Sequence, residues 1–97
     1  MNIDFNKNNG ELIVMIDGRL DTVTAPELES FLGKHCEGTT SLTFNCDKLI
    51  YISSAGLRVL LTAHKRVKGA MKLKNVNELV MEVLEMTGFA DVWEVVR

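Results

Sequence analysis

Two adjacent serines, Ser53 and Ser54, stand between an apolar stretch and an amphipathic one in the sequence LIYISSAGLRVLL, residues 49–61. Hydroxyl groups placed there could cap the helix that follows, act as a nucleophile, or accept a phosphate. The small residues Ala55 and Gly56 follow directly, and they would leave the hydroxyls open to the active site of another protein.

Nucleophilic catalysis is the least supported of the three chemistries. A nucleophile elbow has the pattern Gly-x-Ser-x-Gly, and YISSAG lacks the first glycine. A catalytic serine also needs a histidine as base, with a carboxylate behind it. His35 lies near the end of one expected helix, and His64 lies about three turns after the serines on the apolar face of another. The sequence therefore predicts a protein that is not an enzyme.

Capping and phosphorylation both have a physical basis. Serine is among the best N-cap residues because its hydroxyl accepts an unpaired backbone N–H, and either Ser53 or Ser54 could fill that position. A helix N-terminus also favours negative charge, because it presents free N–H groups and the positive end of the helix dipole. A phosphoserine there would add about two negative charges and change what the surface can dock against. The residues alone leave both interpretations open.

The elements expected around the serines alternate between strands and helices. Period-2 apolar patterns predict strands at residues 3–5, 11–17, 41–46, 70–75 and 92–96. Period-3.6 patterns predict helices whose apolar faces span residues 28–36, 57–67 and 79–84, and Met71, Met81 and Met86 are expected in the core. Thr24 followed three residues later by Glu27 predicts a capping box before the first helix. We therefore expect an α/β fold in a single small domain over residues 1–97, with a mixed sheet, parallel crossovers and about three helices.

The composition argues against several classes of function. The net charge of the 97 residues is −2, which does not favour binding to nucleic acid or to an anionic membrane. No apolar run approaches the roughly 18 residues that membrane insertion requires, and no signal peptide precedes the first strand, so a cytoplasmic location is expected. The two cysteines, Cys36 and Cys46, lack the spacing of a metal site.

Six Lys or Arg and no acidic residue occur between Arg58 and Lys74. We interpret this segment as a solvated face, because no aromatic residue lies among the cations to stack on a nucleic-acid base.

Three stretches together resemble the STAS domain, and specifically the bacterial anti-sigma factor antagonists. They are GRLDTVTAPEL, LIYISSAGLRVLL and VLEMTGFADVWEV, in that order, and the resemblance covers nearly the whole chain. The family motif around its phosphorylated residue runs Asp-Ser-Ser/Thr/Ala-Gly-Leu. When the chains are aligned on Gly56 and the following leucine, Ser54 takes the phosphorylated position and Ala55 the small variable one. Asp21 matches the acidic residue of the neighbouring loop.

Two positions depart from the family pattern. Ser53 stands where many members have aspartate, so a carboxylate is lost beside the acceptor hydroxyl and Ser53 becomes a second candidate for phosphorylation. Arg58 stands where glycine is common, and it could reach a partner's carboxylate or pair with a phosphate on Ser54. Asp21 and Thr22 are expected to line the docking surface next to Ser54, and the alternative for Asp21 is a local turn.

The resemblance implies a function and a mechanism. The unphosphorylated chain would bind an anti-sigma factor with serine kinase activity and so release the sigma factor; phosphorylation at Ser54 would weaken that complex, and a phosphatase would reset it. The ATP would belong to the partner, so no cofactor is expected on this chain. An alternative is a soluble STAS regulatory subunit of a lipid or anion transport complex. The expected partner-binding residues are Asp21, Thr22, Ser53, Ser54, Ala55, Gly56 and Arg58.

Overall fold

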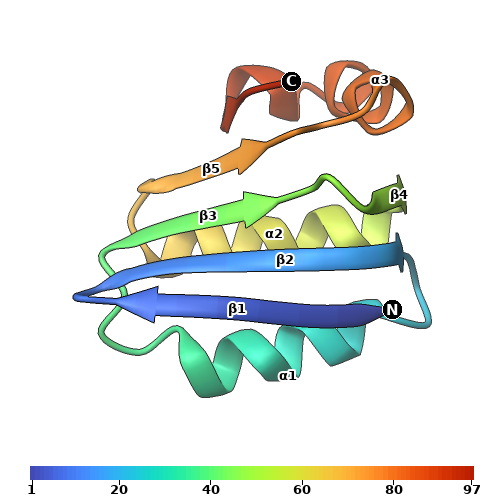
Figure 1. Cartoon of the computed structure of the whole chain (residues 1–97). Helices are drawn as coiled ribbons and strands as arrows, with labels where there is room; N and C mark the ends of the chain where they lie inside the picture. Colours follow the sequence, from blue (N-terminus) through green and yellow to red (C-terminus); the bar gives the residue numbers. More distant parts are fainter.

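Six strands and three α-helices follow one another along the chain (Figure 1). The structure is a computed structural model and describes residues 1–97. The elements are β1 (Asn2–Asn8), β2 (Glu11–Leu20), α1 (Ala25–His35), β3 (Ser41–Asn45), β4 (Leu49–Ile52), α2 (Ser54–Arg66), β5 (Met71–Lys74), α3 (Glu78–Thr87), a short 3-10 helix η1 (Phe89–Asp91) and β6 (Glu94–Val95). The expected α/β class and the three expected helices are confirmed.

The strands form one mixed sheet in the order β1-β2-β3-β5-β6, with β4 pairing the end of β2. Only β1 and β2 are antiparallel, and they are joined by the turn at Asn9 and Gly10. Both turn residues have positive φ, +49° and +85°, which is the geometry that a two-residue hairpin of matching twist requires. Every other pair is parallel, so the carboxyl ends of β2, β3, β4 and β5 point the same way.

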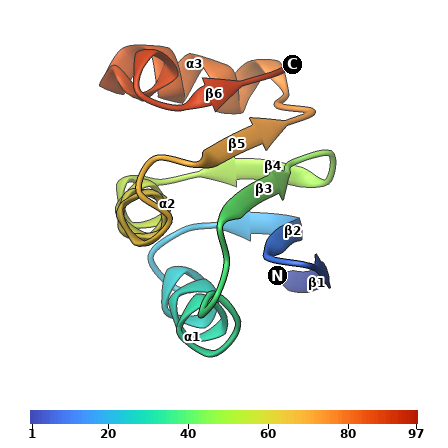
Figure 2. The ribbon, with the colours of Figure 1, turned by 90° about the vertical axis from the view of Figure 1, so that its left-hand side faces the viewer.

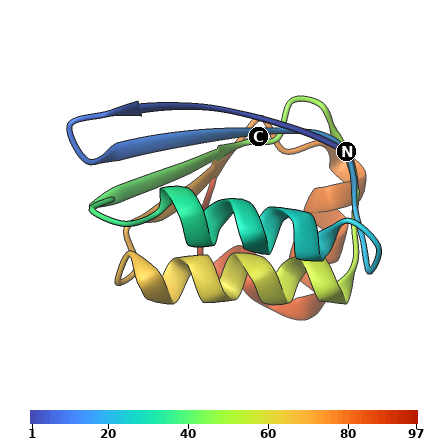
Figure 3. The ribbon, with the colours of Figure 1, turned by 90° about the horizontal axis from the view of Figure 1, so that it is seen from below.

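Helices α1 and α2 lie side by side on one face of the sheet and leave the opposite face without a helix (Figures 2 and 3). The strand residues that alternate toward α1 and α2 are almost completely buried, including Leu12, Val14 and Phe44. Leu28 of α1 and Leu60 of α2 face them from the helices. Helix α3 lies apart from this pair and packs near β4.

The structure corrects four expectations. Residues 49–52 form a strand, β4, which the pattern missed because four residues are too few to show a period. Strand β2 is longer than predicted and runs to Leu20. It pairs with β3 over residues 11–15 and with β4 over residues 18–20, and the register of the β4 pairing shifts between Gly18 and Arg19. Thr24 makes no capping hydrogen bond, so the predicted capping box is wrong. Met86 is 83% exposed and therefore does not belong to the core.

Candidate functional site at the start of helix α2

The structure separates the roles of the two serines. Ser53 is the N-cap of α2, with an extended backbone and a hydroxyl that accepts a long hydrogen bond of 3.5 Å from the N–H of Gly56. Ser54 is the first helical residue; it is exposed, and its hydroxyl has no hydrogen-bond partner within the chain. Ser53 is therefore the cap, and Ser54 presents a free hydroxyl at the positive end of the helix dipole.

Gly56 brings the first turn of α2 against the end of β2. A Cβ atom at Gly56 would lie 2.7 Å from Leu20 Cγ, 2.9 Å from Leu20 O and 3.1 Å from Ile52 Cγ1. The N–H of Ser53 donates to the same Leu20 carbonyl at 2.9 Å. Gly56 is buried, so it shapes the predicted partner-binding surface without itself being available for contact. Because Asp21 follows Leu20 directly, this close approach places the Asp21 loop beside the serines.

The carboxylate of Asp21 organises its own loop. Asp21 Oδ1 accepts hydrogen bonds from the backbone N–H groups of Val23 at 3.0 Å and Thr24 at 3.1 Å. The hydroxyl of Thr24 donates to Arg19 O at 2.7 Å and accepts from the N–H of Asp21 at 2.9 Å. The Thr24 hydroxyl is thus used inside the loop, which is why it does not cap α1. The hydrogen bond from the Thr24 backbone is the main cause that holds the pKa of Asp21 below its usual value near 3.8.

The side chain of Arg19 lies on the face of the sheet opposite α1 and α2. Its guanidinium lies over the ring of Tyr51, 4.4 Å from the ring centroid, and its Nε lies 3.6 Å from Asp21 Oδ2. Leu20 and Ile52, the next residues in the two strands, are buried toward the helices. Because successive side chains of a strand alternate between faces, Arg19 and Tyr51 point to the face without α1 and α2.

A groove of about 280 Å³ runs between α1 and α2 from the side of the serines. Its walls include Thr22, Glu29, Ala55, Arg58 and Arg66. The structure thus brings three predicted site residues, Thr22, Ala55 and Arg58, to one concave surface. Arg58 is exposed and makes no ion pair or hydrogen bond through its guanidinium, whereas Arg66 Nη1 donates to Leu32 O at 3.5 Å.

Sequence reasoning missed one prominent residue of this surface. Val23, at the tip of the Asp21 loop, is 86% exposed. A single exposed valine is not unusual on a protein surface, so Val23 belongs to the candidate site only because the Asp21 loop lies beside the serines. A valine flanked by threonines in an otherwise polar turn was the available signal, because β-branched apolar residues are rare in turns.

Neither histidine lies with the serines. The rings of Phe5, Phe31 and His35 form a cluster, with His35 centred 4.5 Å from each phenylalanine. The ring of His64 lies 6.5 Å from that of Trp93. His64 is ten residues after Ser54 on one helix, which corresponds to about 15 Å along the axis. No histidine is therefore placed to activate either hydroxyl.

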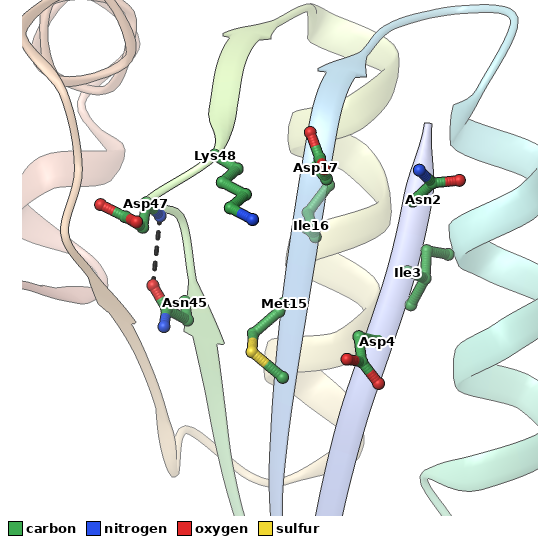
Figure 4. Close-up of a pocket in the computed structure, with 9 residues that line it drawn as sticks. All are labelled: Asn2, Ile3, Asp4, Met15, Ile16, Asp17, Asn45, Asp47 and Lys48. Carbon is green, nitrogen blue, oxygen red and sulfur yellow. Dashed lines mark hydrogen bonds between the residues drawn. The ribbon is translucent and has the colours of Figure 1, made fainter.

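A second hollow, of about 260 Å³, lies on the uncovered face where β2 passes from β3 to β4 (Figure 4). Lys48 extends into the gap between the strands, Asp17 and Asp4 lie across the gap on β2 and β1, and the Asp47 carboxylate points away from the lysine (Figure 4). The hollow is lined by none of the predicted site residues. No group of three His, Cys, Asp or Glu in the chain could hold a metal ion, and no helix is long and apolar enough to cross a membrane.

Two curated proteins are similar to this chain over almost all of its length. The "Anti-sigma-B factor antagonist" of Bacillus subtilis is 30% identical over 98% of this chain and 90% of that protein. The "Putative anti-sigma factor antagonist BtrV" of Bordetella bronchiseptica is 33% identical over 98% of this chain and 85% of that protein.

Solved structures with the same fold include proteins of more than one role. A "putative anti-sigma factor antagonist" from Thermotoga maritima superposes with a TM-score of 0.89 at 17% identity, over 98% of this chain and 86% of that one. The Bacillus cell fate determinant SpoIIAA in its phosphorylated form gives 0.73 at 13% identity, over 97% and 90%. A sulfate transporter family protein from Wolinella succinogenes gives 0.75 at 19% identity, over 90% and 76%. The STAS domain model matches residues 2–97, and the chain therefore belongs to the STAS domain family.

Proposed function

We propose that this chain is an anti-sigma factor antagonist whose binding is switched off by phosphorylation at Ser54. In its unphosphorylated form it binds an anti-sigma factor with serine kinase activity, and the sigma factor is thereby released. The single observation that carries this proposal is the free, exposed hydroxyl of Ser54 at the first position of α2, in a chain whose curated relatives bear the name of antagonists. Residues 1–97 act as one domain in this proposal.

The position of Ser54 suits a reversible phosphate. In the transfer, the Ser54 hydroxyl oxygen bonds to the γ-phosphorus of ATP held by the kinase, ADP leaves, and the hydroxyl proton passes to a base of the kinase. The helix N-terminus then faces the phosphate with free N–H groups, so the fold accepts the new charge. A phosphatase removes the modification by hydrolysis: water attacks the phosphorus, the bond to the Ser54 oxygen breaks, and serine and inorganic phosphate are released.

The docking surface in this proposal is built from two segments. The Asp21 loop contributes Thr22 and the exposed Val23, and the start of α2 contributes Ser54, Ala55 and Arg58. Ser53 holds the helix start in place, and Asp21 holds its own loop through its carboxylate. A phosphate at the centre of this surface would oppose docking through its charge and through the cost of desolvating it.

The experiment that tests the proposal is phosphosite mapping. The purified chain is incubated with Mg-ATP and an extract of its own cells, and Ser54→Ala and Ser53→Ala are treated in parallel as matched controls. We expect phosphate on Ser54 in the parent and in Ser53→Ala, and none in Ser54→Ala. Absence of phosphate from Ser54 under conditions that label another antagonist would contradict the switch.

Partner capture tests the other half of the proposal. We expect a kinase-fold anti-sigma factor to co-purify with the parent chain, and Ser54→Asp to retain much less of it because the aspartate repels the same surface. Capture of a membrane ATPase complex in place of a kinase would favour the alternative of a regulatory subunit in lipid or anion transport. Equal capture by the parent and Ser54→Asp would contradict the role of charge at this position.

A further inference from the structure

One cation beside Ser54 is left without a partner. Arg58 lies in the first turns of α2, four residues after Ser54, and its guanidinium makes neither an ion pair nor a hydrogen bond. Residues four apart on a helix have Cβ atoms about 5–6 Å from each other. Helical side chains also tend to lean toward the N-terminus of their helix, and Arg58 lines the groove together with Ala55, the residue next to Ser54.

The other charged groups near the serines are already engaged or stand farther away. Arg19 lies over Tyr51 on the opposite side of the sheet and is paired with Asp21. Arg66 is two turns farther along α2 and donates to the carbonyl of Leu32 on α1. Glu29 shares the groove with Arg58 but forms no ion pair with it. Arg58 is therefore the cation most available to an anion on Ser54.

We propose that Arg58 binds the phosphate on Ser54 within the same chain and thereby withdraws the free cation from the docking surface. This inference rests on the proposed phosphorylation of Ser54 and adds how the modification is read. An arginine fork and a phosphate form a charge-assisted pair with two parallel hydrogen bonds. The backbone N–H groups of the first helical turn, which lack carbonyl partners, hold the phosphate from the other side.

The pairing reverses the local charge at Arg58. Before modification, Arg58 brings an unpaired positive charge to the end of the groove near Ser54, which suits a carboxylate of the anti-sigma factor; Arg66, farther along the groove, donates to Leu32 O. A phosphoserine brings about −1.5 to −2 charges, so the pair is left with a net charge of roughly −0.5 to −1. A partner carboxylate that was attracted before phosphorylation is repelled after it. In a relative with glycine at this position, the phosphate would add negative charge without removing a cation.

The test uses the whole chain with phosphoserine installed at position 54 during translation, so it needs no kinase. The phosphate is titrated with pH and followed by phosphorus NMR in the parent, Arg58→Ala, Arg58→Lys, Lys65→Ala and Arg19→Ala. Lys65 is the matched control because it is an exposed cation on the same helix, remote from Ser54. Arg19→Ala tests the competing cation.

We expect the second pKa of the phosphate to be higher in Arg58→Ala than in the parent by about half a unit, the size of a partly exposed ion pair. Arg58→Lys should recover part of this difference, and high salt should reduce it. Lys65→Ala and Arg19→Ala should match the parent. The Nε resonance of Arg58 should also shift on phosphorylation of the parent.

Equal phosphate pKa values in the parent and Arg58→Ala would overturn the inference, and so would a shift produced by Arg19→Ala. These outcomes leave the proposed function intact, because phosphosite mapping decides separately whether Ser54 is modified by a cellular kinase. All the substituted arginines and lysines are exposed, so each variant should fold, and a thermal melt of each one checks this.

Discussion

Replacing Gly56 with alanine tests the contact that places the serines beside the Asp21 loop. Alanine adds one methyl group where the ideal Cβ position is 2.7 Å from Leu20 Cγ and 2.9 Å from Leu20 O. The side chain of Leu20 could turn away, but its carbonyl is fixed by the 2.9 Å hydrogen bond from the N–H of Ser53. Relief of the clash therefore requires α2 to move away from β2 or Ser53 to lose that bond.

The expected cost is the difference between two effects. Overpacking of a buried site costs about 1–3 kcal/mol. Alanine is favoured over glycine inside a helix by up to about 1 kcal/mol. We expect Gly56→Ala to lower the free energy of unfolding by about 1–2 kcal/mol, which corresponds to a fall in Tm of roughly 4–8 °C for each kcal/mol in a domain of this size.

Gly33→Ala is the matched control. Gly33 lies within α1, and a Cβ atom there would meet nothing within 4 Å. The same substitution should therefore raise stability by about 0.5–1 kcal/mol through helix propensity alone. The assay is urea unfolding of both variants and the parent, followed by circular dichroism. The reasoning is refuted if Gly56→Ala is as stable as the parent while Gly33→Ala is stabilised.

The remaining predictions concern the cap, the loop carboxylate and a buried thiol. Ser53→Ala should lower the free energy of unfolding by about 0.5–2 kcal/mol because the cap is lost, whereas Ser54→Ala should change it much less; the reverse order in urea unfolding would show that Ser54 is the cap. The carboxyl of Asp21 has a lowered pKa in the folded state, so its stabilising effect is present above about pH 4 and is lost as the pH falls through the folded value. The difference in Tm between the parent and Asp21→Asn should accordingly shrink below about pH 4, and a constant difference down to about pH 2 would contradict this role. Burial raises the pKa of Cys46 to about 12, so a thiol reagent at neutral pH should label Cys46 only after unfolding, and rapid labelling of the native chain would disprove its burial.

Local patterns in the sequence were enough to predict most of the elements but not their ends. The alternation of Leu42 and Phe44 predicted β3, and the helical spacing of Leu57 and Leu60 predicted α2, because burial of one face imposes the period directly. Strand β4 was not predicted, because its four residues pair only with the end of β2, which is distant in the sequence.

The candidate site was also predicted only in part. The sequence indicated that Ser53 and Ser54 begin a helix, but it left the choice of cap open. That choice depends on the extended backbone of Ser53, which the hydrogen bond to Leu20 O helps to fix from a neighbouring strand. The predicted capping box of Thr24 is wrong for a similar reason. The Thr24 hydroxyl forms hydrogen bonds with Arg19 O and Asp21 Oδ1 and none with the backbone N–H groups of α1.

Residue types at short spacings were enough to predict the resemblance to the STAS domain, the α/β class and a serine pair at the start of a helix. Packing between distant parts of the chain decided which serine is free, because the parallel pairing of β2 with β4 brings Leu20 against Gly56 and sets where α2 begins. It also decided that Arg58 remains unpaired beside Ser54 while Arg19 is engaged on the other face. Spacing along α2 predicts that Arg58 lies near Ser54, but it does not show that Arg58 is unpaired or that Arg19 lies over Tyr51, since these contacts depend on the strand or helix that packs next to each side chain.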